Sequence, residues 1–369
     1  MSIETTMTRA WQRQAAWLWL LLPVSWLYGF ITMLRRQAYK VGLFANYRPP
    51  IPVMVIGNIT VGGSGKTPLI IELVTHLQKQ GIKVGVISRG YGGDSSQMPA
   101  LVHADSLPST VGDEPSLIVN MTGTAMAVCP NRKQAITTLL EAYPDLQLII
   151  ADDGLQHYAL QRDIEWIVVD ASRGFGNQQL LPTGFLREPM SRLKGANVVY
   201  HEKAEMIATD NSKGQAKRLT MHLQADKLQL LWSSDVEIDN LTVAAKVPMS
   251  IMPNSRVHAV SGIGYPQRFF DTLLSLGFDV IGHPYPDHYD FSLDELLQYT
   301  EQPIIVTSKD AVKIKALLID ATSRQPLSKE DQELVSRLWV LPVTAVLSDS
   351  CYDSLHQQLK ALNVDINNG

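Results

Sequence analysis

Residues 53–67 combine an apolar run with a glycine-rich turn that ends in Gly65-Lys66-Thr67. The backbone N–H groups of such a turn surround phosphate oxygens, and the helix that follows adds a positive field at its N-terminus. In this pattern Lys66 is expected to reach the β- and γ-phosphates of a nucleotide, and the Thr67 hydroxyl to hold Mg²⁺. The segment therefore predicts the phosphate-binding loop of a nucleotide triphosphatase or kinase.

The loop departs from the strict pattern at one position. That pattern requires a glycine where this chain has Thr60, and the additional glycines stand at Gly57, Gly62 and Gly63 instead. A glycine-rich turn without a ligand is the alternative. The apolar strand before the turn and the amphipathic helix that begins at Pro68 favour the nucleotide site. The predicted nucleotide-binding residues are Thr60, Val61, Gly62, Gly63, Ser64, Gly65, Lys66 and Thr67.

Two acidic residues, Asp152 and Asp153, follow the apolar strand predicted at residues 146–151. Ligands of a parallel sheet gather at the carboxyl ends of its strands, which places both carboxylates beside the phosphate loop. A carboxylate there binds Mg²⁺ directly or through water. A solvated turn is the alternative. We predict Asp152 and Asp153 as metal ligands together with Thr67.

A candidate acid–base group lies in the motif Gly112-Asp113-Glu114-Pro115. One interpretation is a helix start, with Glu114 as the N-cap and Pro115 at the first helical position. The other makes Asp113 a general base that takes a proton from a substrate hydroxyl. His288, in the polar and aromatic loop at residues 284–289, would support such a group, although a loop histidine is as often structural.

Several arginines are candidates for phosphate contacts, because a guanidinium pairs with phosphate oxygens through two hydrogen bonds. Arg89 follows the strand predicted at residues 84–88 and stands among flexible glycines. The other candidates are Arg132, Arg187 and Arg192.

The elements that must position these residues alternate between strands and helices. Strands are predicted at 84–88, 125–129, 146–151, 164–170 and 197–200, with helices at 116–121 and 132–143. This alternation indicates an α/β fold, with a mostly parallel sheet of the P-loop NTPase type and helices on both faces.

The pattern changes near residue 204, where polar runs precede short strands at 218–223 and 228–233. A strand at 256–261, a helix at 267–276 and a strand at 304–307 restore the α/β pattern. We predict a P-loop domain over residues 41–204 and a smaller α/β domain over 205–369.

The first 40 residues differ from the rest of the chain. Residues 14–34 carry no charged side chain, and four of the seven tryptophans fall at positions 11, 17, 19 and 26. About 20 apolar residues span a bilayer as a helix, and tryptophan prefers the membrane interface. A buried core helix is the alternative, and no small-residue cleavage site marks a signal peptide. We predict a membrane-associated helix within residues 1–40, either spanning or lying in the interface.

Composition and charge bear on the partners of the protein and on its cellular compartment. A net charge of −4 and a pI of about 6.1 argue against general nucleic-acid binding. The two cysteines, Cys129 and Cys351, form no disulfide framework and indicate a reducing compartment. Arg35, Arg36 and Lys40 follow the apolar helix, so the positive-inside tendency places the catalytic body on the cytoplasmic side.

Over residues 17–348 the chain resembles the tetraacyldisaccharide 4′-kinases, the lipid A 4′-kinases of Gram-negative bacteria. Several motifs coincide in order: Leu-Leu-Pro-Val-Ser-Trp-Leu-Tyr-Gly at 21–29, Gly-Asn at 57–58, Gly-Gly-Ser-Gly-Lys-Thr-Pro at 62–68, Ser-Arg-Gly-Tyr-Gly-Gly at 88–93, Gly-Asp-Glu-Pro at 112–115, Asp-Asp-Gly-Leu-Gln-His at 152–157, Leu-Pro at 181–182, Leu-Arg-Glu at 186–188, Gly-Ile-Gly at 262–264, Asp-His at 287–288 and Lys-Asp-Ala-Val-Lys at 309–313. The displaced glycine of the phosphate loop is itself similar to the family's form.

The resemblance implies transfer of the ATP γ-phosphate to the 4′-hydroxyl of a tetraacylated glucosamine disaccharide 1-phosphate, which gives lipid IVA. It implies ATP and Mg²⁺ as cofactors, Asp113 as the base paired with His288, and Lys66 among the catalytic residues. Other candidate substrate or phosphate contacts are Asn58, Arg89, Glu114, Arg132, Gln156, His157 and Arg187. The expected partners are the lipid and the inner-membrane surface, with no nucleic acid and no obligate protein partner.

The chain departs from the family pattern at two positions. Tyr289 stands where a second histidine is frequent, and Ser308 stands where a glutamate usually precedes Lys309. Neither change removes a proposed catalytic group, but both alter loops expected to close over ATP.

Two other functions share the phosphate loop. A GTPase usually selects guanine with one residue between a lysine and an aspartate, whereas Lys309 and Asp310 are adjacent here. A membrane-associated ATPase switch often has an additional lysine early in the loop, where this chain has Thr60 and Val61. ATP hydrolysis that is independent of a lipid acceptor would favour the switch.

Overall fold

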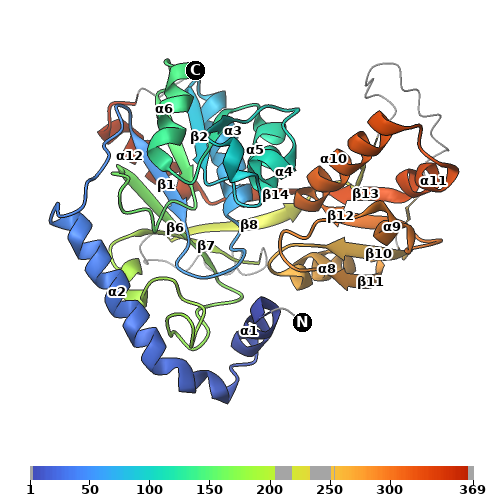
Figure 1. The fold of residues 1–369 in the computed structure, drawn as a ribbon, viewed down its shortest axis with the longest axis horizontal. Coiled ribbons are helices and arrows are strands. Elements are labelled where there is room, and N and C mark those ends of the chain that lie inside the picture. The colour runs from blue at the N-terminus through green and yellow to red at the C-terminus, as the bar shows by residue number, and fades with distance from the viewer. Residues whose placement is uncertain (1–2, 204–217, 233–250, 253, 365–369) are drawn as a thin grey trace.

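The computed structural model describes residues 3–203, 218–232, 251–252 and 254–364. Figure 1 shows two lobes side by side, with an N-terminal helical arm along one side of the larger lobe. We call the larger sheet with its helices the first lobe and the smaller sheet with its helices the second lobe.

The described part of the first lobe is built on a nine-stranded sheet in the order β14-β8-β7-β6-β1-β5-β2-β4-β3. Its strands are β1 (Val53–Gly57), β2 (Val84–Ser88), β3 (Ala100–Leu101), β4 (Ala125–Val128), β5 (Leu148–Asp152), β6 (Ile164–Asp170), β7 (Asn197–His201), β8 (Leu219–Ala225) and β14 (Val343–Leu347). The two edge pairs, β14 with β8 and β3 with β4, are antiparallel. The inner pairs are parallel, so their carboxyl ends meet at one edge of the sheet.

Helices cover both faces of this sheet, as predicted. They are α3 (Lys66–Lys79), α4 (Pro108–Val111), α5 (Asp113–Thr122), α6 (Arg132–Ala142) and α12 (Asp349–Ala361), with short η2 (Ser95–Gln97) and η3 (Met190–Leu193) turns. Strand residues alternate between the faces. Met54 shares a core with Leu73 of α3 and Leu355 of α12, whereas its neighbour Val55 shares the opposite core with Ile136 of α6. The central strands are buried on both faces, which explains their continuous apolar sequence.

The second lobe has a five-stranded sheet in the order β11-β10-β12-β13-β9 among the residues described. Its elements are β9 (Gln229–Leu230), β10 (Arg256–Ser261), α8 (Pro266–Ser275), β11 (Asp279–Pro284), α9 (Leu293–Leu297), β12 (Ile304–Thr307), α10 (Ser308–Arg324), α11 (Lys329–Arg337) and β13 (Leu338–Leu341). All pairs except β13 with β9 are parallel. Apolar clusters lie on both faces of this sheet.

The predicted domain boundary does not follow the two sheets. The prediction assigned residues 205–369 to the second domain, but β8, β14 and α12 belong to the first lobe. Strands β8 and β14 form an antiparallel ribbon, and Ala225 pairs with Val343 where the ribbon leaves the first sheet. In Figure 1, β8 runs toward the second lobe, and β14, which is antiparallel to it, returns from that lobe. The sequence concealed this arrangement because the partners of the ribbon are more than one hundred residues apart.

Helix boundaries also differ from the prediction at one functional motif. Helix α5 begins at Asp113, and Gly112, with φ 98°, is its N-cap. Glu114 is therefore not the N-cap, and Pro115 lies in the first turn rather than at the first helical position. A proline fits there because the first N–H groups of a helix have no partner within the helix.

The N-terminal arm consists of α1 (Ile3–Gln12), a 3₁₀ turn η1 (Ala16–Leu21) and α2 (Leu22–Lys40). The 25 residues Ala16–Lys40 have the length and mean hydropathy of a membrane span, and 11% of the most apolar window is buried. Ser25 is buried against the first lobe and Leu18 is also buried, whereas Trp19, Trp26 and Phe30 are exposed.

We expect Leu355→Ala to lower the free energy of unfolding by about 2–5 kcal/mol, because its side chain is fully buried in the core that α12 shares with α3. Chemical denaturation, followed by a probe of the first lobe, measures the change. The matched control is Leu107→Ala, since Leu107 is 50% exposed in the same lobe. Equal effects of the two substitutions would contradict the assignment of α12 to the first lobe.

Candidate active site

The phosphate loop, residues 58–65, turns sharply between β1 and α3. Gly62 and Gly65 adopt φ values of 92° and 91°, which favour glycine. Asn58 is fully buried, and its Nδ2 donates a hydrogen bond to the Gly62 carbonyl at 3.1 Å. Asn58 therefore braces the loop from inside, and its contact with substrate or phosphate stays a prediction. The hydroxyl of Ser64 and the Oδ1 of Asn58 are buried with no protein partner.

A neighbouring segment supports the outer side of the loop. Val61 N–H donates to the Phe185 carbonyl at 2.9 Å, and Thr60 forms an isolated bridge with Leu186. Arg173 donates to the Val61 carbonyl at 2.5 Å. The loop backbone at Thr60 and Val61 is thus held by protein, and Gly62 to Gly65 form the part that turns into the helix.

Asp152 is the last residue of β5 and pairs in register with Ile56 of β1, one residue before the end of that strand. This register places it directly beside the phosphate loop. Its Oδ2 accepts a hydrogen bond from Ser88 Oγ at 3.1 Å, while its Oδ1 is buried without a partner. Asp153, with φ 46°, lies 3.3 Å from Lys66 Nζ and 3.0 Å from Arg187.

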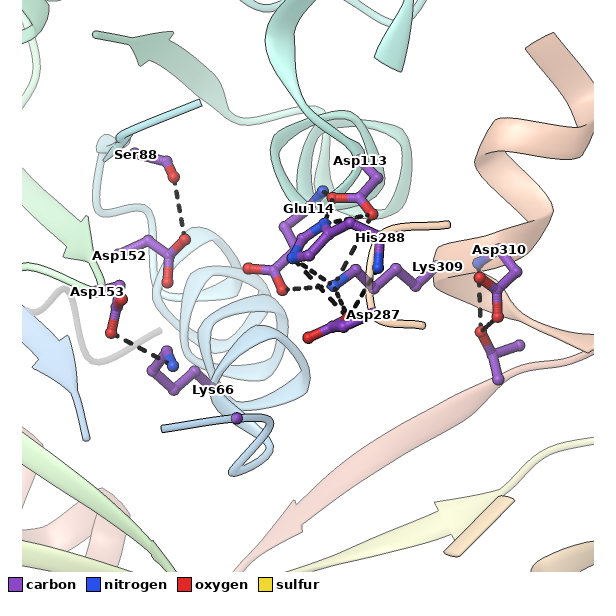
Figure 2. Close-up of polar contacts among 12 residues, drawn as sticks. Lys66, Ser88, Asp113, Glu114, Asp152, Asp153, Asp287, His288, Lys309 and Asp310 are labelled. Carbon is purple, nitrogen blue, oxygen red and sulfur yellow. Dashed lines mark hydrogen bonds and ion pairs between the residues drawn. The ribbon is translucent and has the colours of Figure 1, made fainter. Parts of the chain in front are cut away.

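The two adjacent carboxylates have opposite electrostatic environments. Burial and then the nearby Glu114 carboxylate raise the pKa of Asp152 to about 7. For Asp153, burial opposes ionisation, but Lys66 and Arg187 outweigh it and lower the pKa to about 2. Figure 2 shows Glu114 and Asp152 pointing toward one another across the site.

The predicted pair Asp113 and His288 is in contact across the two lobes. His288 Nδ1 lies 3.0 Å from both carboxylate oxygens of Asp113. Asp113 is 4% exposed and His288 occupies a left-handed turn with φ 59°. Burial opposes ionisation of Asp113, but the hydrogen bond from His288 and the charge of Lys309 outweigh it, so the pKa of Asp113 is lowered.

Two lysines that sequence reasoning did not assign complete this group. Lys309 Nζ lies 3.0 Å from Glu114, 3.2 Å from Asp287 and 3.2 Å from His288 Nε2. Lys313 Nζ lies 3.8 Å from Asp113. Burial would lower the pKa of Lys309, but Glu114, Asp287 and Asp113 outweigh it and raise the pKa above its usual value. The signal for both was their spacing of four residues at the start of α10, which puts them on one helix face.

The remaining predicted contacts divide into two groups. Gln156 donates to the Asn58 carbonyl at 3.1 Å and to Glu188 at 2.9 Å, so it joins the support of the loop. Arg187, through Asp153, lies at the site itself.

Arg132 is buried, and it donates to the carbonyls of Cys129 and Asp152. Its predicted role in phosphate binding therefore competes with a structural one. His157 is half-buried, and burial together with Arg132 lowers its pKa to about 4, so its ring is neutral at pH 7. Arg89 is exposed at the carboxyl end of β2. Arg192 pairs with Glu165 and Glu188, so its guanidinium is engaged by protein carboxylates.

No group of three or more His, Cys, Asp or Glu side chains among the described residues forms a metal cage. The donors present are one or two carboxylates and a hydroxyl, and the free Oδ1 of Asp152 is a buried acceptor. This set fits Mg²⁺, which usually binds to few protein ligands and completes its octahedron with water and phosphate oxygens. Zinc would require nitrogen or sulfur ligands.

The opposite pKa shifts of the two carboxylates predict opposite effects on stability. Asp152→Asn should raise the melting temperature at pH 8 in the absence of nucleotide and metal, by roughly 2–4 °C for each kcal/mol recovered. The raised pKa means that the folded state retains a proton that the unfolded state loses. The loss of folding stability caused by ionising Asp152 is therefore absent well below pH 4 and complete above about pH 7.

The matched control is Asp153→Asn, which should lower the melting temperature at pH 8. Because the pKa of Asp153 is lowered in the folded state, the ionised side chain stabilises the fold above the ordinary pKa of aspartate. This stabilisation is lost as the pH falls through about 2. Asparagine tolerates the left-handed backbone at this position. A loss of stability in Asp152→Asn at pH 8 would contradict the environment described for Asp152.

Three comparisons bear on the identity of the chain. The family model for tetraacyldisaccharide-1-P 4′-kinases matches residues 17–360. A tetraacyldisaccharide 4′-kinase of Psychrobacter cryohalolentis is 75% identical over 99% of each chain. Another, from Ectopseudomonas mendocina, is 39% identical over 98% of this chain and 99% of its own.

The fold agrees with these sequence matches. The LpxK structure from Aquifex aeolicus, solved in complex with ATP, has a TM-score of 0.66 and 25% identity, and the match covers 94% of this chain and 99% of that chain. The predicted α/β fold and the predicted class of ATP-dependent lipid kinase are both confirmed. The chain belongs to the tetraacyldisaccharide 4′-kinase family.

Proposed function

We propose that this enzyme transfers the γ-phosphate of ATP to the 4′-hydroxyl of tetraacyldisaccharide 1-phosphate at the cytoplasmic face of the inner membrane. The observation that carries the proposal is the contact between Asp113 and His288, which joins the two lobes. It stands beside a phosphate loop whose lysine and paired carboxylates suit a nucleotide. Family membership supports the same reaction.

Phosphoryl transfer requires positioning and charge stabilisation more than covalent chemistry. The N–H groups of Gly62 to Gly65 and the Lys66 ammonium would bind the β- and γ-phosphates. Asp152, Asp153 and Thr67 would hold Mg²⁺, which neutralises phosphate charge when bound. Lys66 already contacts Asp153, so nucleotide binding exchanges one anionic partner of this lysine for another.

Asp113 is proposed as the base that accepts the proton of the 4′-hydroxyl, with His288 holding it in place. The lowered pKa of Asp113 keeps its carboxylate deprotonated at neutral pH, which a base requires. Lys309 and Lys313 approach the same carboxylate. They balance its charge and hold the second lobe against α5.

Asp113→Asn should lower kcat by about 10²- to 10⁴-fold, because general-base catalysis contributes on that scale. Transfer of ³²P from γ-labelled Mg-ATP to tetraacyldisaccharide 1-phosphate in detergent micelles measures it. His288→Asn should lower kcat less if it acts by holding Asp113. The matched control is Asp145→Asn, because Asp145 is exposed in a surface pair with Lys83.

Full activity of Asp113→Asn would refute its role as the base. Hydrolysis of ATP by the wild type without any labelled lipid would refute the proposed acceptor and favour a membrane-associated ATPase switch.

The contacts of the N-terminal arm with the first lobe favour a placement of α2 in the membrane interface rather than across the bilayer. Ser25 Oγ bonds the Leu180 carbonyl at 3.0 Å and Thr183 Oγ1 at 2.8 Å, and Tyr28 donates to the Arg187 carbonyl at 3.1 Å. One face of α2 is therefore attached to the first lobe, along which α2 runs in Figure 1. The Arg187 contact lies close to the site, because Arg187 also pairs with Asp153. A helix attached in this way presents its Trp and Phe side chains to a bilayer along its length.

An arm lying in the interface has both ends on one side of the membrane. Arg13→Cys and Lys40→Cys flank the apolar segment, and the native Cys129 and Cys351 are buried. An impermeant thiol reagent should label both variants in inside-out inner-membrane vesicles and neither in right-side-out vesicles. Labelling of Arg13→Cys from the opposite side to Lys40→Cys would show that the helix spans the bilayer.

A further inference from the structure

A second contact between the lobes lies away from Asp113 and involves Arg268 of α8. Its guanidinium donates to Asp170 Oδ2 at 2.5 Å and to Ser172 Oγ at 3.0 Å, and its other nitrogen lies 3.0 Å from His201 Nδ1. Asp170 and His201 end β6 and β7 and are paired in register. In Figure 1, α8 and α10 approach the first lobe at opposite sides of the second lobe.

Asp170 connects this contact to the phosphate loop. Its Oδ1 accepts from Ser172 N–H at 3.1 Å, Ser172 Oγ at 2.7 Å and Arg173 N–H at 3.3 Å, which fixes the turn after β6. That turn presents Arg173 to the Val61 carbonyl. Burial opposes ionisation of Asp170, but Arg268 and the hydrogen bonds outweigh it and lower the pKa.

His201 provides a second connection to the same loop. Its Nδ1 lies 3.2 Å from the Ser64 carbonyl as well as 3.0 Å from the Arg268 guanidinium. Burial and the charge of Arg268 lower the pKa of His201 to about 4, so the ring is neutral at pH 7. A neutral ring nitrogen either donates or accepts. Nδ1 must accept when Arg268 is docked, and it is free to donate to Ser64 only when Arg268 is withdrawn.

We infer that Arg268 is a positioning residue that transmits the closure of the second lobe to the phosphate loop. When the second lobe is closed, Arg268 contacts Asp170 and His201 at the same time. Its contact with Asp170 holds the turn that carries Arg173. Its contact with His201 sets the ring tautomer, so that Nδ1 no longer donates to the Ser64 carbonyl. This inference rests on the proposed kinase reaction, because the loop it adjusts is the one that would bind ATP.

Closure matters at this loop because the second lobe reaches it directly. A Cβ on Gly264 would lie 3.1 Å from the Gly63 nitrogen and 3.0 Å from Asp287. Asp287 in turn contacts Lys309, the partner of Glu114 and Asp113. One rigid-body position of the second lobe therefore aligns Arg268 with β6 and β7 and His288 with Asp113. Two separated contacts fix an orientation that a single contact leaves free to rotate.

Arg268→Gln removes the charge and one of the two donor directions while it keeps most of the side-chain volume. We expect kcat/KM for ATP to fall about 10- to 100-fold, which is the scale of a small misplacement at a reacting centre. Arg268→Lys should recover part of the loss, because it restores the charge but not the paired contacts. Arg256→Gln is the matched control, since Arg256 forms an exposed pair with Asp279 in the same lobe.

Distance measurement separates this role from general stability and from the proposed chemistry. Spin labels on Glu141→Cys of α6 and Lys329→Cys of α11, both exposed, report the separation of the lobes in the full chain with ATP alone. The Arg268→Gln background should give a broader and longer distance distribution than the wild-type background. An unchanged distribution overturns the inference even if activity falls, and unchanged kinetics overturn it even if the distribution broadens.

A ring-nitrogen NMR spectrum of ¹⁵N-histidine protein adds a signature that a purely structural role would not change. His201 Nδ1 should be unprotonated in wild type and protonated in Arg268→Gln, with the signal assigned by its loss in His201→Gln. The same tautomer in both proteins would overturn the coupling to Ser64. These two measurements require no lipid acceptor, so their failure is distinct from a failure of the Asp113 activity test.

Discussion

A buried carboxylate requires counter-charges, and Asp113 obtains its charged partners from the other lobe. Its side chain is almost fully enclosed, and His288, Lys309 and Lys313 approach it from the second lobe. An ionised group in that position is strongly destabilised when its partners are withdrawn. The arrangement of the lobes is therefore tied to the charge of one residue at the start of α5. The same electrostatic requirement that assembles the site also holds the two lobes together.

The paired carboxylates at the end of β5 follow a different principle. Asp153 is in contact with two cations, whereas Asp152 accepts a hydrogen bond from a neutral hydroxyl, and burial together with Glu114 outweighs the charges of Lys66 and Arg132 on it. An ionised carboxylate on a buried strand end lowers the stability of the folded chain when the nearby cations do not compensate for its burial. Functional sites commonly retain such groups because the ligand supplies the missing charge. The environment of Asp152 therefore fits a cation supplied by a bound ligand.

Much of this molecule could be predicted from its sequence. The phosphate loop, the strand that ends at Asp152, and the strands β6, β10 and β12 carry strong local patterns, and the structure places them as expected. Asp113 and His288 were linked only through the family resemblance, because 175 residues separate them.

The ribbon of β8 and β14, the place of α12 and the contact of Arg268 with Asp170 could not be predicted. Each depends on pairing between distant segments that have no special local composition. Lys309 and Lys313 were visible as a motif, but a lysine at a helix start is usually solvated, so only the buried acids across the interface reveal their role.

The ribbon has a consequence for synthesis of the chain. Because β14 and α12 follow the second lobe in sequence but complete the first, residues 226–342 form an insertion between two neighbouring strands of one sheet. A chain that emerges from the ribosome in order makes nearly the whole first lobe and then must wait. Its sheet retains an unpaired edge at β8, and the groove for α12 remains open, until the second lobe has been made. The first lobe is begun before the second and finished after it.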